Sequence, residues 1–75
     1  MVVIAAPQGP DYLVRWYSEN YARNGYELLS RQVEQSSGAR ILRYGVGRSN
    51  ATVIIMQSGG GGSQVMVTET RGVTL

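Results

Sequence analysis

The chain has 75 residues and a formal net charge of +2, and it contains neither cysteine nor histidine. Their absence excludes a disulfide, a zinc site of the usual Cys/His kind, a thiolate nucleophile and an imidazole base, which argues against an enzyme. A chain this short forms one small domain that buries only about 60% of the surface its unfolded form exposes. We therefore expect a single domain over residues 1–75, whole or excised from a longer chain, with no cofactor and no metal.

The basic residues are all arginine, a bias typical of GC-rich bacterial genomes. Arginines and carboxylates are interspersed along the chain, as on a solvated surface, and the carboxylates show no local motif for acid/base catalysis. No apolar run approaches the roughly 20 residues that cross a bilayer. The opening residues MVVIAAP also lack the charged start and the length of a signal peptide.

The chain opens with a β-branched run, Val2 to Ile4, which is closed by Pro7 and Gly9. This pattern predicts a strand of about five residues followed by a turn. Pro10 suits the first turn of a helix because its missing N–H costs nothing there, and Asp11 beside it complements the helix dipole. We therefore expect a helix to begin at this point.

Bulky side chains then recur at helical spacing, at Leu13, Trp16, Tyr17 and Tyr21. A domain without phenylalanine needs bulky residues to fill its core, so we expect this stripe to face the core. Tyr12 lies off the stripe and is the best candidate among the aromatics for an exposed contact. The pair Asn24-Gly25 predicts a left-handed C-terminal cap, after which the chain turns directly into a strand.

Four further strands are expected after the helix, over 26–33, 39–46, 51–57 and 64–70, separated by Gly- and Ser-rich turns. Antiparallel strands joined by short turns form a meander, and one helix can cover one of its faces. The fold class is therefore α+β, a single helix packed on an antiparallel sheet in the order β-α-β-β-β-β. The continuous apolar run in 51–57 predicts a central strand, and the alternation in 64–70 predicts an edge strand.

Two pairs of residues are candidate contacts for a partner. Arg40 and Arg43 lie in one predicted strand, where they could touch an acidic group, although their odd spacing turns them to opposite faces. Val65 and Val67 lie on the strand expected at the edge, which could add to a strand of another chain. With Tyr12, these are the residues that we expect to contact a protein partner or a second copy of the chain.

A small nucleic-acid-binding domain, with arginine and tyrosine side chains on the sheet, is the alternative interpretation. Such a domain predicts an affinity that falls steeply as salt rises. Nucleic-acid binders usually carry a denser positive charge than the +2 of this chain. We therefore place protein interaction first.

The helix-to-strand junction WYSENYARNGYEL resembles a pattern found in small modules of bacterial envelope proteins, in which FY, a gap of mixed polarity, Leu, small residues and Gly-Trp precede a strand. Trp16 and Tyr17 stand for the FY pair, Tyr21 for the leucine, and Gly25-Tyr26 for Gly-Trp. The segment TVIIMQSGGGGSQVMVTE resembles the closing hairpin of such modules.

The resemblance implies a strand before the helix, a meander after it, and a location in the bacterial periplasm or cell envelope, without implying a reaction. The targeting segment would then lie outside these residues, and the cytoplasm is the alternative location. We expect a non-catalytic protein-interaction or assembly module that contacts a partner, or itself, through the open sheet face or the edge strand.

Overall fold

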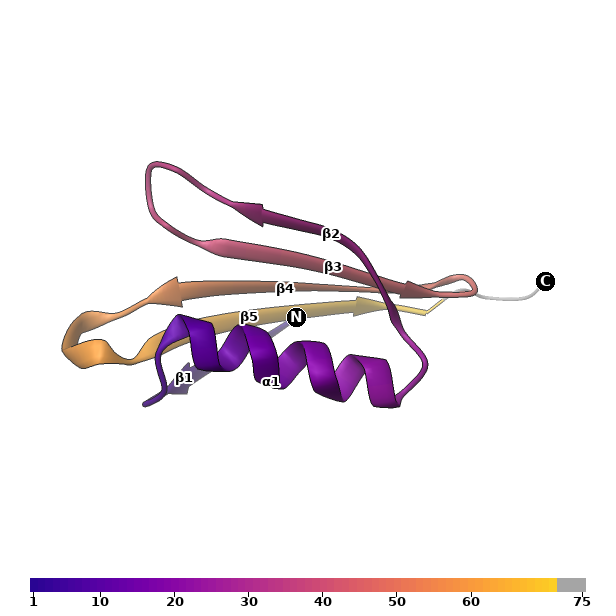
Figure 1. Cartoon of the computed structure of the whole chain (residues 1–75), viewed down its shortest axis with the longest axis horizontal. Coiled ribbons are helices and arrows are strands. Elements are labelled where there is room, and N and C mark those ends of the chain that lie inside the picture. The colour runs from indigo at the N-terminus through magenta and orange to yellow at the C-terminus, as the bar shows by residue number, and fades with distance from the viewer. Residues whose placement is uncertain (72–75) are drawn as a thin grey trace.

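The computed structural model describes residues 1–71 and places one helix against a five-stranded antiparallel sheet (Figure 1). The elements in chain order are β1 (Val2–Ala6), α1 (Pro10–Arg23), β2 (Glu27–Val33), β3 (Arg40–Val46), β4 (Ser49–Gln57), the 3₁₀ turn η1 (Gly59–Gly61) and β5 (Ser63–Thr70). The predicted α+β class and the predicted order of elements are confirmed.

Helix α1 begins and ends where its terminal residues predict. A proline fills its first position, and Asp11 in the first turn and Arg23 in the last turn both complement the helix dipole. Gly25, just past the end of the helix, has a φ of 84°. The Tyr26 N–H then donates to the Tyr21 carbonyl over 2.9 Å, which satisfies one of the last carbonyls of the helix.

The strand order in the sheet is β1-β5-β4-β3-β2, and every neighbouring pair is antiparallel. The central position predicted for β4 is confirmed. The prediction that β5 is an edge strand is wrong, because β1 pairs with its outer side, from Val2 opposite Val67 to Ala6 opposite Ser63. Helix α1 carries the chain from one edge of the sheet to the other, so the meander that starts at β2 ends beside β1. The two edges are β1 and β2.

The core lies between α1 and the middle strands of the sheet. It contains Leu13, Val14 and Tyr21 of the helix and Leu42, Tyr44, Ala51, Val53, Ile55 and Val65 of the sheet. Val65, predicted as a contact residue, is 0% exposed and is therefore part of this core. The alternation of apolar and polar residues along β5 was predicted from the sequence. The face of the strand that carries Val65 is the one that the helix covers.

Trp16, expected in the core with the rest of the aromatic stripe, is 46% exposed. Successive residues of a helix are rotated by about 100° around its axis. The side chains of α1 that meet the sheet cluster around one direction, and Trp16 is rotated more than about 100° away from that direction. It therefore lies on the flank of α1. Helical spacing identified the stripe but placed its centre one residue off.

Two stacked tyrosines form the middle of the core. The rings of Tyr21 in α1 and Tyr44 in β3 lie 4.7 Å apart between centroids at an interplanar angle of 20°. Each hydroxyl has a partner, as buried tyrosines require. The Tyr44 hydroxyl lies 2.9 Å from Ser18 Oγ, and the Tyr21 hydroxyl donates to Glu69 Oε1 over 2.8 Å.

A single helix is too narrow to cover this sheet. Neighbouring strands lie about 4.8 Å apart, so five strands span about 19 Å, whereas a helix with its side chains is about 10 Å wide. Helix α1 lies closest to β4, β3 and β2. The β1 side of the same face is left open, and the opposite face of the sheet is covered by no element within residues 1–71.

The glycine run between β4 and β5 packs against the turn that joins β1 to α1. Ser63 Oγ donates to the Gln8 carbonyl over 2.9 Å, and the Ser58 N–H donates to the Gly62 carbonyl over 2.9 Å. A Cβ atom on Gly62 would lie 2.7 Å from the Ala6 carbonyl oxygen. The last glycine of the run is therefore required by close backbone packing.

We expect Gly62→Ala to lower the free energy of unfolding by about 1 to 3 kcal/mol, because the backbone must shift to admit the methyl group. The matched control is Gly59→Ala in the same loop, where a Cβ atom meets nothing within 4 Å. The control should leave stability within about 1 kcal/mol of the parent. Urea unfolding of the three proteins checks this, and equal stability of the two variants would contradict the packing described.

Candidate functional site

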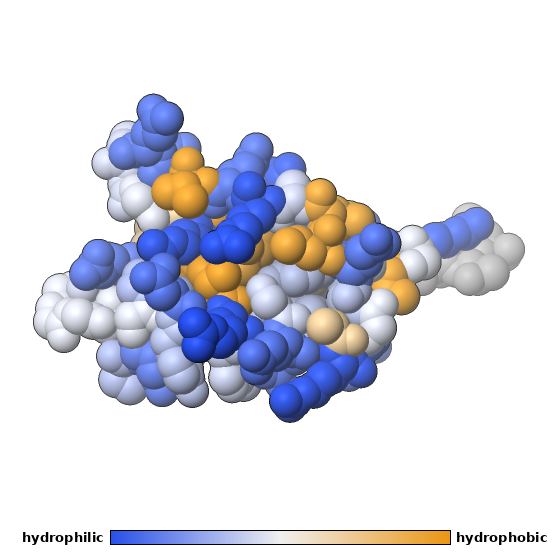
Figure 2. Space-filling view, in the orientation of Figure 1, coloured by the Kyte–Doolittle hydropathy of each residue, from blue (hydrophilic) through white to orange (hydrophobic). Residues whose placement is uncertain are grey.

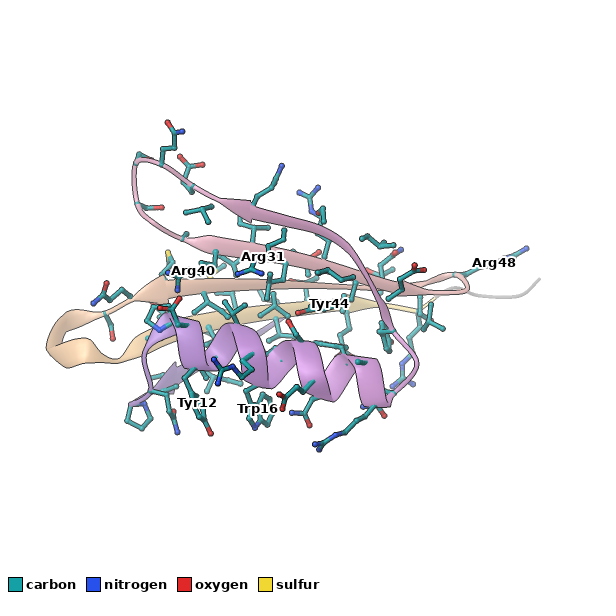
Figure 3. All side chains as sticks on the ribbon, viewed as in Figure 1. Tyr12, Trp16, Arg31, Arg40, Tyr44 and Arg48 are labelled. Carbon is teal, nitrogen blue, oxygen red and sulfur yellow. The ribbon has the colours of Figure 1, made fainter. Side chains whose placement is uncertain are left out.

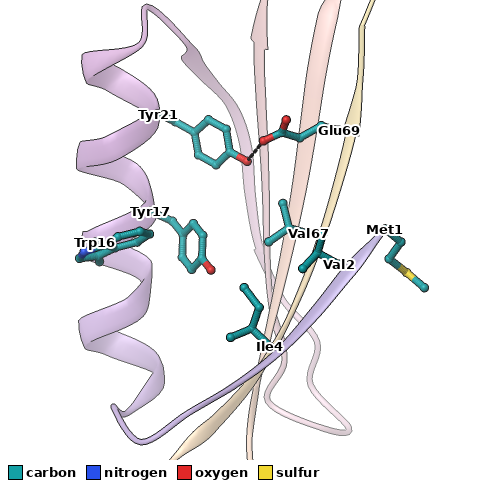
Figure 4. A pocket seen from close by; sticks show the side chains of 8 residues that line it. All are labelled: Met1, Val2, Ile4, Trp16, Tyr17, Tyr21, Val67 and Glu69. Atoms are coloured by element: carbon teal, nitrogen blue, oxygen red, sulfur yellow. Dashed lines mark hydrogen bonds between the residues drawn. The ribbon is translucent and has the colours of Figure 1, made fainter.

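A groove runs between α1 and β1 on the helix-covered face of the sheet (Figure 4). Its volume is about 460 Å³, within the range of about 300 to 1,000 Å³ typical of small-molecule sites. The helix side is aromatic and the strand side aliphatic, and the lining consists of Trp16, Tyr17, Tyr21, Met1, Val2, Ile4, Val67 and Glu69. Towards the start of the helix the groove continues past Tyr12, Leu13 and Gln8. We call this surface the α1–β1 groove.

The aromatic wall of the α1–β1 groove is held by contacts between its rings. Trp16 and Tyr17 meet edge to face at a centroid distance of 4.8 Å, and Tyr17 and Tyr21 lie 6.5 Å apart with rings inclined by 26°. Figure 4 shows the Tyr17 ring extending from the helix towards Ile4 and Val67, and the Tyr21 ring extending towards Glu69. Burial raises the pKa of the Tyr17 hydroxyl, so this wall is neutral at physiological pH.

Glu69 is the one charged side chain in this lining. Burial of Tyr21, its hydrogen bond to Glu69 and the charge of that carboxylate together raise the pKa of Tyr21 far above its ordinary value of 10.0. Tyr21 therefore stays protonated and donates to the carboxylate. Within residues 1–71 the only ion pair shorter than 4 Å joins Arg40 to Asp11, so no arginine neutralises Glu69 there.

The opposite flank of α1 is basic. Figure 3 shows Arg31 and Arg40 on the side of the helix away from the aromatic wall. Arg40 Nη1 lies 2.8 Å from Asp11 Oδ1. Burial raises the pKa of Tyr44, and the hydrogen bond with Ser18 and the charge of Arg31 offset only part of that rise. The two flanks of one helix therefore differ in the sign of their local charge.

The face of the sheet away from α1 carries an apolar row. Val3, Met66, Ile54 and Ile41 stand opposite one another in successive strands from β1 to β3. Residues directly opposite in an antiparallel sheet share a face, so these side chains lie side by side. The row ends at Gln32 in β2. On the helix-covered face, Figure 2 shows separate apolar patches above α1, over β2 and β3.

The two edges of the sheet differ in how they are protected. β2 carries Glu27 and Arg31 and has a bulge between Leu28 and Ser30, and charges and bulges are the features that keep natural sheet edges from pairing. β1 has the sequence VVIAA, with no charge, no proline and an unbroken register against β5. Within residues 1–71 no strand pairs with its outer side. Its exposed side chains are Val2 at 55%, Val3 at 52% and Ile4 at 41%.

The five predicted contact residues lie in four different places. Tyr12 and Val67 line the α1–β1 groove. Arg40 lies on the helix-covered face and Arg43 on the open face, as their odd spacing predicted. Val65 is in the core. The nucleic-acid interpretation requires arginines and tyrosines to share one surface. In the structure they do not.

Sequence reasoning missed the unprotected β1 edge, the apolar row and the position of Glu69. β1 was recognised as a strand, but its neighbour in the sheet was not. The available signal was the lack of any charge or proline in VVIAA, which is a mark of an edge only once the strand order is known. Glu69 had no local motif to distinguish it from a solvated carboxylate.

Comparisons with protein-family models, with curated proteins and with solved structures find no match for this chain. In residues 1–71 no helix has the length and apolar character needed to span a membrane. The same residues bring together no three Asp, Glu, His or Cys side chains in the manner of metal ligands. The argument about function therefore depends on the surfaces described above.

We expect the free energy of unfolding to fall as pH rises above about 10, where tyrosines of the unfolded chain ionise. The pKa values of Tyr17, Tyr21 and Tyr44 are raised in the folded chain, so the unfolded state releases more protons and stability is lost with rising pH. The chain has no lysine and no cysteine, so few other groups titrate there. Urea unfolding between about pH 9 and about pH 12 measures this slope.

Tyr21→Phe should lower stability at neutral pH by about 1 kcal/mol through the lost hydrogen bond, and should reduce the alkaline slope. Tyr12→Phe, at an exposed tyrosine of the same helix, is the control and should follow the parent. An alkaline slope that Tyr21→Phe leaves unchanged would show that Tyr21 does not contribute to it.

Proposed function

We propose that this chain is a non-catalytic assembly module that associates with a second copy of itself through the outer edge of β1. The observation that supports the proposal is the contrast between the two edges of the sheet. β2 has the charges and the bulge that prevent pairing, and β1 has neither. An uncharged, apolar edge strand with unpaired backbone groups is a template for another strand.

The β1 strand is complementary to itself in the antiparallel direction. A two-fold axis at Val3 places Val2 opposite Ile4 of the second copy. Val2 and Ile4 are two residues apart and point to the same face of the strand, so each side chain stays on the face that it already occupies. The central pairs, Val3 with Val3 and Val2 with Ile4, are then β-branched, and no like charges meet. Such a contact is isologous and closes as a dimer.

This pairing also extends the apolar surfaces of each copy. The row of Val3, Met66, Ile54 and Ile41 would continue through the junction into the same row of the second copy, forming one apolar row across eight strands. On the other face, Val2 and Ile4 of both copies would cover part of each other. The exposure of these residues in the single chain is therefore reduced in the dimer.

Resemblance to envelope modules adds a periplasmic or envelope location to the proposal. A nucleic-acid-binding role finds less support, because Arg40 is held by Asp11 on the helix-covered face while Arg43 lies on the open face. Apolar edge pairing should be insensitive to salt, whereas binding to phosphates weakens steeply as salt rises. Measurement at two salt concentrations separates these roles.

We expect sedimentation equilibrium and light scattering to show a salt-insensitive monomer–dimer equilibrium at concentrations up to about 1 mM. At that concentration, an association free energy of about 4 kcal/mol places half of the chains in dimers. Val3→Lys should shift this equilibrium to monomer, because it places a positive charge opposite its own copy at the edge. The matched control is Gln32→Lys. Val3 and Gln32 occupy the two ends of one cross-strand row on the open face, so the control adds the same charge at the protected edge.

A third variant, Ile54→Lys, distinguishes edge pairing from stacking of the open faces. Ile54 lies in the middle of the apolar row and away from both edges, so edge pairing should tolerate the change whereas face stacking should not. Circular dichroism checks that each variant is folded. A chain that is monomeric throughout, or a dimer that Ile54→Lys abolishes and Val3→Lys leaves intact, would overturn the proposal.

A further inference from the structure

We propose that the α1–β1 groove binds an amphiphilic amine, a small molecule with an alkyl chain and an ammonium group, with its cation beside Glu69. The inference rests on the groove and its charge, not on the assembly of two copies. The groove lies on the helix-covered face, whereas the proposed dimer contact is the outer edge of β1.

The walls of the groove suit an alkyl chain that ends in a cation. Val2, Ile4 and Val67 supply aliphatic surface, and Tyr17 and Tyr21 supply aromatic rings across from it (Figure 4). Apolar surface of this kind favours burial of hydrocarbon. Tyr21 is stacked on Tyr44, so the attraction for the cation at this end comes from the Glu69 carboxylate.

Three observations set the sign of the ligand's charge. Glu69 is the only charged side chain in the lining, and within residues 1–71 neither an arginine nor the N-terminal ammonium of Met1 lies within 4 Å of its carboxylate. The carboxylate is held in place by the Tyr21 hydroxyl, which bonds to one oxygen at 2.8 Å. This contact also lies near the C-terminal end of α1, which carries partial negative charge. An ammonium group is favoured at this end and a sulfate or phosphate is disfavoured.

The length of the groove sets the size of the chain. Tyr21 lies near its acidic end, and Tyr12 lies at the other end, nine residues earlier in the helix. At 1.5 Å per residue the groove extends about 13 Å along the helix axis. A chain of about eight carbons with its ammonium group fits that length, so octyltrimethylammonium is the probe that we choose.

Trp16 provides a direct readout, because it is the only tryptophan of the chain and it lines the groove. Its fluorescence is titrated with octyltrimethylammonium, with octanol as the neutral analogue and with octyl sulfate as the anionic analogue, all below the concentrations at which they form micelles. We expect saturable binding of the cation, about tenfold tighter than that of octanol. Octyl sulfate should bind more weakly than octanol.

Glu69→Gln tests the role of the carboxylate while its amide oxygen can still accept the Tyr21 hydrogen bond. The variant should bind octyltrimethylammonium no more tightly than octanol. The matched control is Glu27→Gln, which removes a carboxylate from β2 at the far edge of the sheet and should bind as the parent does. Urea unfolding verifies that both variants are folded.

The Val3→Lys variant separates this inference from the proposed assembly, because Val3 lies on the open face and outside the groove lining. The cation should still bind this variant saturably and more tightly than octanol, whether or not the parent chain dimerises. Equal binding of the cation, octanol and octyl sulfate would overturn the inference, as would an affinity for the cation that Glu69→Gln leaves unchanged. A titration without saturation would overturn it as well.

Discussion

The stack of Tyr21 on Tyr44 is the contact on which the rest of the structure depends. It joins helix α1 to β3 at a ring distance of 4.7 Å, and aromatic pairs of this kind bury a large apolar area in one contact. The two hydroxyl groups then extend in different directions. Tyr44 meets Ser18 on the helix, and Tyr21 reaches Glu69 on β5. One pair of rings thus fixes the helix against two strands, β3 and β5.

The width of the helix explains why the molecule has exposed apolar surfaces. A helix about 10 Å wide cannot cover a sheet about 19 Å across, so part of one face stays open wherever the helix lies. The tyrosine stack holds α1 over the middle strands, and the uncovered part becomes the α1–β1 groove on one side and the basic flank with Arg31 on the other. The acidic groove and the basic flank are therefore consequences of the same placement.

Much of the fold followed from local patterns. The aspartate after the helix-starting proline, the Asn24-Gly25 cap and the alternation of apolar residues identified the helix, its ends and the five strands. The opposite orientation of Arg40 and Arg43 followed from the pleat. These features depend on hydrogen bonds and steric preferences within a few residues, which act the same way in any fold. The same reasoning placed Trp16 in the core, because helical spacing locates an apolar stripe less precisely than the packing of α1 on the sheet does.

The sequence by itself determined the helix with its ends, the strands and their order, and the meander from β2 to β5, whereas β4 begins at Ser49, two residues before its predicted start. Only the tertiary structure decided that β1 pairs with β5, and this one pairing makes β1 the exposed edge. The position of the helix over the middle strands, beside β5, accounts for the burial of Val65 and for the groove beside Glu69. The physical reason is that β1 and β5 lie some 60 residues apart in the chain. Their pairing depends on where the helix crosses the sheet and on how the core packs beneath it. Neither is determined by the residues of one short segment.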